Sequence, residues 1–118
     1  MNKKMNSRIL RTLPREKAFY FFTSIGNYTG ESAVSLKEFV EKINEVNMKS
    51  LNFHLYRGDF QKWMAEVLQD KELAEELGKL QKTSLSEDSL RNQLYAVVSR
   101  RYNELTSQLG SLRKNPSI

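Results

Sequence analysis

The sequence contains no cysteine, one histidine, two prolines and five glycines among its 118 residues. A chain without thiols has no disulfide, no thiolate nucleophile and no thiolate ligand for a metal ion. A single histidine also excludes the histidine spacings of common zinc sites and leaves few ways to pair a nucleophile with a base. We therefore predict a protein that is not an enzyme and that needs no cofactor and no metal.

Long apolar runs are absent as well. No stretch approaches the roughly 18 uninterrupted apolar residues that a membrane-spanning helix requires. The basic start, MNKKMNSRILRTLPREK, is not followed by the apolar segment of a secretory signal peptide. We therefore expect a soluble, cytoplasmic protein without a membrane partner.

The composition is that of an ordinary globular domain, with 39% hydrophobic and 28% charged residues. The formal net charge of +5 is concentrated in residues 1–17, which carry six cationic side chains and one anionic side chain. We expect a basic, partly disordered arm over residues 1–14, a single helical domain over residues 15–110 and a flexible tail over residues 111–118. The cationic residues of the first 17 are Lys3, Lys4, Arg8, Arg11, Arg15 and Lys17.

The segment 15–25 is ambiguous between helix and strand. Pro14 suits the first position of a helix, and apolar residues follow it at helical spacing. The aromatic run FYFF at 19–22 would equally suit a buried strand. We favour the helical interpretation, while periodicity alone leaves helix or strand open for residues 18–25; residues 26–34 are expected to be a turn-rich connector.

The clearest start signal for a helix is the capping box formed by Ser35 and Glu38. Apolar residues follow it at the 3.6-residue period, which predicts a helix over about 36–45. Asn47 is suited to cap a short next helix, and Gly58 is suited to end that helix in the left-handed conformation.

Asp59 and Asp70 predict the starts of two further helices, because each precedes apolar residues at helical spacing. The last helix is expected to be the longest, over about 87–109, with acidic residues in its first turn and Gly110 as its stop. The predicted fold class is therefore all-α, a compact bundle of five or six helices with a long C-terminal helix.

One dense polar and aromatic group occurs at residues 53–63, FHLYRGDFQKW. In a structural interpretation, Asp59 accepts backbone N–H bonds at the start of a helix, and Arg57 pairs with Asp59 or with a preceding carbonyl. His54 then satisfies a buried backbone group, and Trp63 anchors the core. In a functional interpretation, His54, Arg57 and Trp63 line a pocket for an anionic or aromatic group, since arginine offers a bidentate fork and tryptophan a stacking surface. The candidate binding residues are His54, Arg57, Asp59 and Trp63.

Three stretches, SLKEFVEKINEV, KSLNFHLYRGDFQKWM and QDKELAEEL, resemble a family of small, uncharacterised, helical archaeal and bacterial proteins. That family has a Ser-Leu-x-Glu-Phe helix and a Phe-His-x-x-Arg-Gly-Asp-Phe-x-x-Trp core. The resemblance covers residues 19–80, and its specific part is the segment from His54 to Trp63. Because the family has no established activity, the resemblance implies a shared fold and gives little about function.

Residues 36–57 are also similar to a helix-turn-helix, whose second helix enters the major groove of DNA. The pattern departs from the motif, since Val40 replaces a small residue, Asn44 replaces a glycine and the turn is one residue longer. The basic arm would add contacts to phosphates. The candidate nucleic-acid contacts are Lys3, Lys4, Arg8, Arg11, Lys49 and Asn52.

Many aromatic residues without catalytic groups favour a non-catalytic helical module for protein interaction or regulation. We expect such a module to bind a protein partner or to form a homodimer through its long last helix. The alternative is a nucleic-acid-binding protein that uses the degenerate helix-turn-helix, the basic arm or both. A small-molecule site at residues 54–63 is the third hypothesis.

Overall fold

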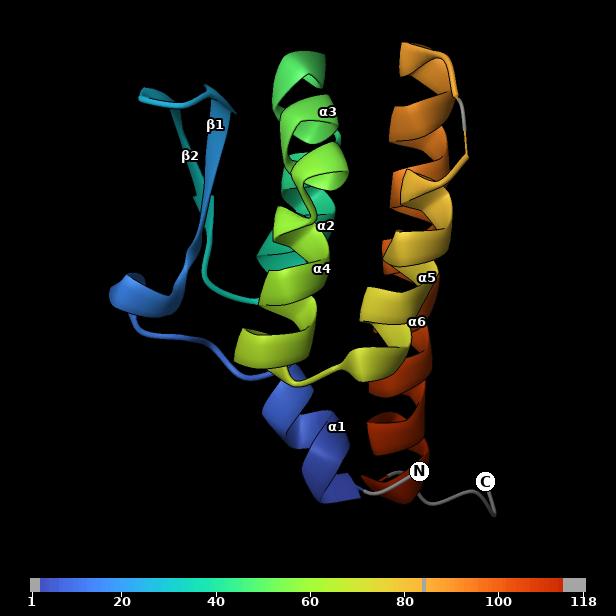
Figure 1. Cartoon of the computed structure of the whole chain (residues 1–118). Helices are drawn as coiled ribbons and strands as arrows, with labels where there is room; N and C mark the ends of the chain where they lie inside the picture. The colour runs from blue at the N-terminus through green and yellow to red at the C-terminus, as the bar shows by residue number, and fades with distance from the viewer. Residues whose placement is uncertain (1–2, 84, 114–118) are drawn as a thin grey trace.

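Six α-helices and one β-hairpin form the part of the chain that the computed structural model describes, residues 3–83 and 85–113 (Figure 1). The predicted fold class is confirmed in part, because a two-stranded antiparallel sheet accompanies the helices. No helix in this part of the chain combines the length and the apolar character needed to cross a membrane. The elements are α1 (Lys3–Ile9), a 3-10 turn η1 (Arg15–Lys17), β1 (Phe19–Ser24), β2 (Asn27–Ala33), α2 (Leu36–Ile43), α3 (Met48–Arg57), α4 (Asp59–Lys62), a π-helical segment η2 (Trp63–Leu68), α5 (Lys71–Gln81) and α6 (Glu87–Arg113).

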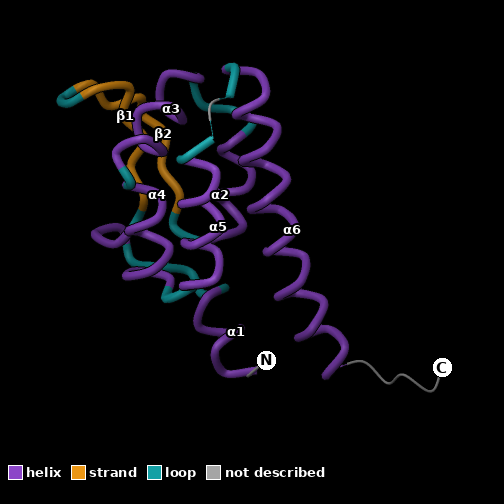
Figure 2. The backbone as a smooth tube through the Cα atoms, turned by 45° about the vertical axis from the view of Figure 1, so that its right-hand side comes forward, coloured by secondary structure: helices purple, strands orange, loops and turns teal. Residues whose placement is uncertain are grey.

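The elements form three layers. The hairpin covers one side of α2, α3 and α4, and α5 and α6 cover the other side (Figure 1). Helix α1 lies at one end of the molecule and packs against α6. The hairpin lies at the edge of the molecule, with its turn directed away from the helices (Figure 2).

A hydrophobic core with an aromatic centre joins the hairpin to the helices. The ring of Phe19 in β1 lies 5.0 Å from that of Phe60 in α4 and 5.7 Å from that of Phe39 in α2, measured between ring centroids. Aromatic pairs at such distances contribute stability beyond the burial of their surface. Helices α5 and α6 complete this core with buried aliphatic side chains, among them Leu73, Leu77, Leu94, Val98 and Leu105.

The predicted helix caps at Ser35, Asn47 and Asp70 are confirmed. Each side chain accepts a hydrogen bond from a backbone N–H group in the first turn of the following helix, at 3.2, 2.8 and 3.2 Å respectively. Gly58 ends α3 with a φ of 81°, the left-handed conformation predicted for it. These ends were predictable because each depends on one residue and its nearest neighbours.

The helical interpretation of residues 15–25 is wrong. Phe19 and Phe21 point into the core, whereas Tyr20 and Phe22 are only half-buried, and this alternation is that of a strand. The aromatic side chains pack on the surface of α3 and α2, and this tertiary contact decides the conformation over the helical spacing.

Residues 26–34, expected to be a connector, are mostly strand β2. Ser24 pairs with Asn27 across the turn, and Gly26 adopts a φ of 84° that the tight turn requires. The register shifts twice along the hairpin, so that three residues of β2 around Gly30 stand opposite a single position of β1. Gly26 and Gly30 therefore mark the turn and the bulge of a hairpin.

Asp59 does not cap a helix with its side chain, so that prediction is wrong. It is the first residue of α4, and its carboxylate turns to His54 instead. Helix α4 continues into the π-helical segment η2, which ends at Gln69 with a φ of 66°. The spacing of apolar residues in this segment is compatible with an α-helix and does not reveal the π-helical conformation.

The segment expected to be a basic, partly disordered arm contains a helix and three buried side chains. Residues 3–9 form α1, and the side chains of Asn6, Ile9 and Leu13 are buried. The Leu13 N–H group donates a hydrogen bond of 2.7 Å to the Val34 carbonyl. The charged residues of this segment lie between apolar residues that reach the core, so the basic composition did not prevent folding.

Helix α6 is longer than predicted. It runs through Gly110 to Arg113, so the prediction that Gly110 stops it is wrong. Glycine costs about 1 kcal/mol inside a helix relative to alanine, which a long helix tolerates. Of the predicted flexible tail, residues 111–113 are helical, and residues 114–118 lie outside the described residues.

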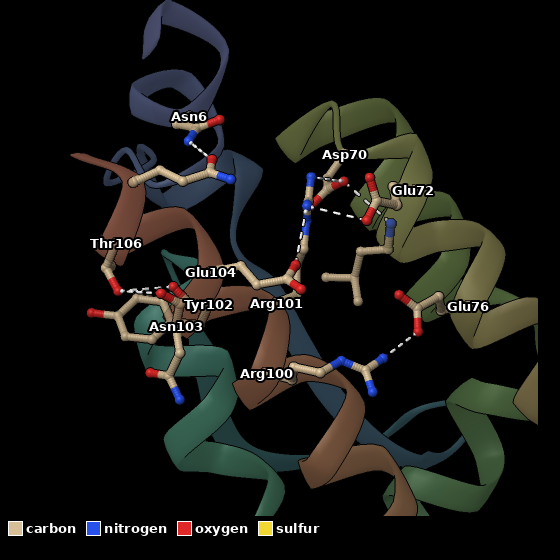
Figure 3. Close-up of polar contacts among 12 residues, drawn as sticks. Asn6, Asp70, Glu72, Glu76, Arg100, Arg101, Tyr102, Asn103, Glu104 and Thr106 are labelled. Carbon is tan, nitrogen blue, oxygen red and sulfur yellow. Dashed lines mark hydrogen bonds and ion pairs between the residues drawn. The ribbon is translucent and has the colours of Figure 1, made fainter. Parts of the chain in front are cut away.

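A buried ion pair between Arg101 and Asp70 ties α6 to the start of α5 (Figure 3). The Nε and Nη2 atoms of Arg101 donate hydrogen bonds of 2.8 and 3.1 Å to the two carboxylate oxygens of Asp70. Burial lowers the pKa of Arg101, but its hydrogen bonds and charge interactions with Asp70 and Glu72 outweigh this effect and raise that pKa. The guanidinium is therefore held in its charged form.

Candidate functional site

A cleft of about 450 Å³ opens between the hairpin and α3. Its walls come from β1 and the hairpin turn on one side and from the second half of α3 and the start of α4 on the other. Most of the exposed lining is apolar, which is typical of sites that bind ligands in this range of volume. We call it the hairpin cleft, and its lining residues are Phe19, Tyr20, Phe22, Ile25, Gly26, Phe53, His54, Arg57 and Asp59.

His54 forms the floor of the cleft and joins the two walls. Its Nε2 atom accepts a hydrogen bond of 2.8 Å from the backbone N–H group of Phe22, and its Nδ1 atom lies 2.8 Å from Oδ2 of Asp59. Because a backbone amide can only donate, Nε2 carries no proton. Nδ1 therefore carries the proton and donates it to Asp59, which fixes the neutral tautomer.

Burial lowers the pKa of His54, and this effect outweighs the nearby carboxylate of Asp59, which acts in the opposite direction. If His54 were protonated, the N–H group at its Nε2 atom would face the backbone N–H group of Phe22. Two donors would then stand opposite each other without an acceptor between them. Both effects favour the neutral ring at pH 7. Since both ring nitrogens are occupied by protein groups, His54 positions the cleft and does not offer a free base.

Arg57 presents a positive charge at the rim of the cleft. Its guanidinium carbon lies 4.8 Å from the centroid of the Phe53 ring, and its Nε atom lies 3.4 Å from Oδ2 of Asp59. The side chain is 49% exposed. Within the described part of the chain, no protein group accepts a hydrogen bond from the two terminal nitrogens of Arg57, so they are available to a ligand.

Trp63 does not line the hairpin cleft, contrary to the interpretation that placed it in one pocket with His54 and Arg57. Its indole N–H group donates a hydrogen bond of 2.9 Å to the Lys17 carbonyl, and its ring stacks on Phe39 at a centroid distance of 5.4 Å. It is buried. Trp63 therefore anchors η1 and the hairpin to the core, while the other three predicted binding residues meet in the cleft.

The comparison with known proteins identifies a family. A model described as a family of unknown function (DUF5752) matches residues 14–115, most of the chain. The chain belongs to this family. The resemblance found in the sequence is confirmed to that extent, whereas the proposed motif and an archaeal or bacterial distribution stay predictions. No curated protein and no solved structure matches the chain.

The match to the DUF5752 family covers the hairpin, α3 and α4, and thus the whole cleft. It also covers a second hollow of about 370 Å³ on the other side of Phe53, lined by Thr23, Lys49, Asn52, Phe53 and Tyr56. Phe53 contributes to both hollows and separates them. Lys49 and Asn52, two of the predicted nucleic-acid contacts, therefore lie beside the candidate site.

The remaining nucleic-acid candidates lie elsewhere. Lys3, Lys4 and Arg8 belong to α1, and Arg11 follows it, whereas Lys49 and Asn52 lie in the first half of α3 at the other end of the molecule (Figure 1). Arg8 donates to the Gln69 side chain and Arg11 to the Val67 carbonyl, so both arginines contact the end of η2. The two predicted groups of contacts thus do not form one continuous surface.

The hairpin side of the cleft was missed by sequence reasoning. Tyr20, Phe22 and Ile25 were assigned to a helix, and no role was predicted for them as ligand contacts. The signal that could have placed them is the combination of an aromatic run with Gly26 and Asn27, which favours a hairpin. In the part of the chain that the structure describes, no group of three or more acidic or histidine side chains is arranged to hold a metal ion.

Proposed function

We propose that this protein is a non-catalytic protein-interaction module that binds its partner through the hairpin and the adjoining edge of α3. The main observation for this proposal is the location of the large apolar side chains that are exposed to solvent. Among the described residues these are Met5, Ile25, Tyr28, Tyr56 and Tyr95, and three of the five lie on the hairpin or on α3. Clustered exposed apolar groups mark interaction surfaces more often than isolated ones do.

These exposed groups are continuous with the two hollows. The ring of Tyr28 lies 5.4 Å from that of Phe22 and 5.8 Å from that of Tyr20, both of which line the hairpin cleft. Tyr56 lines the second hollow. We call the hairpin cleft, the second hollow and Tyr28 together the docking face. Its mixture of aromatic side chains with an arginine is the composition enriched in protein interfaces.

The state of His54 supports binding over catalysis at this face. A general base needs a ring nitrogen within reach of a substrate proton. Both nitrogens of His54 are held, by Phe22 in the hairpin and by Asp59 in α4, so proton transfer would require breaking a contact that joins α3 to one of these elements. The arrangement instead gives a fixed apolar surface with a charged rim.

Site-specific cross-linking tests the proposal. A photoreactive benzoylphenylalanine replaces Tyr28 on the docking face, and a matched control replaces Tyr95, which is similarly exposed but lies on α6 away from the hairpin. The proteins are irradiated in the cells that produce them. We expect one discrete cross-linked species from position 28, and its loss when Phe53→Ala is added.

The cross-linked mass identifies the partner class. A species of twice the mass of the chain assigns the docking face to a second copy, and any other discrete mass assigns it to a different protein. Either result supports the proposal if position 95 does not give the same species. No species from position 28, or the same species from both positions, would contradict it.

A further inference from the structure

The charged groups around the hairpin cleft define the chemistry of its occupant. Arg57, Lys49 and Asp59 are the charged residues that line the two hollows, and His54 is neutral, so the docking face carries a net positive charge of one. A partner that complements this charge carries an anionic group.

Arg57 is already oriented to receive such a group. The Phe53 ring supports one face of its guanidinium, and Asp59 holds its Nε atom. Asp59 is fixed in turn by the hydrogen bond that it accepts from His54. The two terminal nitrogens project from this support, and a planar pair of N–H donors matches a carboxylate in a bidentate geometry.

The negative charge of Asp59 does not oppose such a ligand strongly, because its Oδ2 atom accepts the hydrogen bond from His54 and lies 3.4 Å from Nε of Arg57. Arg57 and the N–H group of His54 both face this oxygen. A carboxylate on the far edge of the guanidinium would complete a line of alternating charges. This arrangement is stabilised more than an isolated surface pair, since Arg57 loses little side-chain freedom on binding.

The rest of the cleft is apolar and open. Phe22, Phe53 and Ile25 form walls that suit a large apolar side chain, with Phe19 and His54 beneath them. The second hollow borders the cleft at Phe53, so an occupant that reaches both hollows is longer than one small group. An extended peptide fits this surface better than a free small acid.

We propose that the hairpin cleft binds a peptide segment of a partner protein in which an aromatic side chain enters the cleft and a neighbouring carboxylate pairs with Arg57. This inference rests on the proposed function and specifies which partners the docking face selects.

Three blocked peptides test the proposal by nuclear magnetic resonance titration of the full chain. The first is Gly-Ser-Phe-Asp-Ser-Gly, and the others replace its Asp by Asn or its Phe by Ala. We expect the first peptide to shift the backbone amides of Phe22, Ile25 and Arg57, and to bind at least tenfold more tightly than either of the other two. Equal binding of the three peptides, or shifts confined to other regions, would overturn the proposal.

The variant Arg57→Gln tests whether Arg57 causes the preference for the Asp peptide over the Asn peptide. In Arg57→Gln the Asp and Asn peptides should bind within twofold of each other, whereas the control Arg100→Gln should keep the full preference. Arg100 is also exposed and also paired with a carboxylate, but it lies on α6. A preference that survives in Arg57→Gln would overturn the proposal, and thermal unfolding of both variants checks that they are folded.

Two further comparisons distinguish a failure of this inference from a failure of the proposed function. Phenylacetate carries the same two groups without a peptide, and binding as tight as that of the first peptide would overturn the assignment to a peptide. If none of the peptides binds while position 28 still cross-links to a partner, the carboxylate inference fails and the docking face stands. If the Asp peptide binds as expected but position 28 gives no cross-link, the proposed function fails.

Discussion

The guanidinium of Arg101 and the carboxylate of Asp70 share two hydrogen bonds although the residues stand 31 positions apart in the chain. Their side chains are only 5% and 1% exposed. Asp70 also caps α5 through the Leu73 N–H group, so one carboxylate serves both a helix start and a contact between helices. Removing the charge of Arg101 leaves the Asp70 carboxylate without a charged partner in a region that water barely reaches, whereas Arg101 keeps Glu72 and Glu104 when Asp70 is neutralised.

We expect Arg101→Met to lower the free energy of unfolding by about 3–5 kcal/mol, because Asp70 would then be a buried unpaired charge. The measurement is urea unfolding followed by the fluorescence of Trp63, the only tryptophan in the sequence. Arg100→Met is the control, since Arg100 makes an exposed ion pair with Glu76 and such pairs contribute about 0–1 kcal/mol.

The double variant Asp70→Asn with Arg101→Met separates charge from packing. Asparagine retains the helix cap and removes the charge, so the double variant should be more stable than Arg101→Met alone. If the loss of unfolding free energy in the double variant equals the sum of the losses in the two single variants, the buried charge is not the cause of the loss in Arg101→Met.

Stability should depend on pH through His54. Its pKa is lowered in the folded protein, so the unfolded chain takes up a proton first as the pH falls below the ordinary value of about 6.5. The stability contribution of neutral His54 is therefore complete above that value and is lost as the pH falls toward the lower pKa of the folded state. The free energy of unfolding, measured between pH 7.5 and 5, should decrease over this range.

His54→Gln is the matched variant for that experiment. The glutamine amide can accept a hydrogen bond from Phe22 and donate one to Asp59, but it does not titrate. His54 is the only histidine, so the variant should lose most of the decrease between pH 7 and 5.5. An unchanged pH profile in His54→Gln would show that other groups cause it.

The same substitution should have opposite effects at two glycines. Gly58 has a φ of 81°, and Gly78 lies inside α5 without a positive φ, while an added Cβ atom would meet no atom within 4 Å at either position. Gly58→Ala should cost about 1–2 kcal/mol through backbone strain alone. Gly78→Ala should add about 0.5–1 kcal/mol of stability, because alanine favours the helix. Thermal unfolding of the two variants measures both, and a loss at Gly78 would contradict this account.

The helices were predictable from the sequence where their ends depend on local chemistry. Ser35, Asn47 and Asp70 each meet a backbone N–H group within three residues, so the sequence alone identifies them as caps. The hairpin was not predictable in this way. The conformation of Phe22 depends on an amide hydrogen bond to His54, 32 positions later, and on packing against α3.

One wall of the candidate site could be predicted from the sequence, because its residues lie close together in the chain. His54, Arg57 and Asp59 occur within six residues, and their types indicated a polar group at a helix junction. The opposite wall could not be predicted, because the positions of Phe19 and Phe22 require a β-strand, and the sequence of this segment is also compatible with a helix. Trp63 belonged to the same sequence group, but its indole donates to the Lys17 carbonyl and its ring lies in the core.

The burial of Phe19 and Phe21 has a kinetic consequence for recognition. These two rings fix β1 in the core, so the wall of the cleft cannot swing outward unless part of the interior is exposed to water. The proposed partner would therefore meet a surface that already stands in its bound position, and only exposed side chains such as Ile25 would need to rotate. Association should proceed without a slow opening step, at the rate constants of about 10⁵–10⁷ M⁻¹s⁻¹ that are typical of rigid protein pairs.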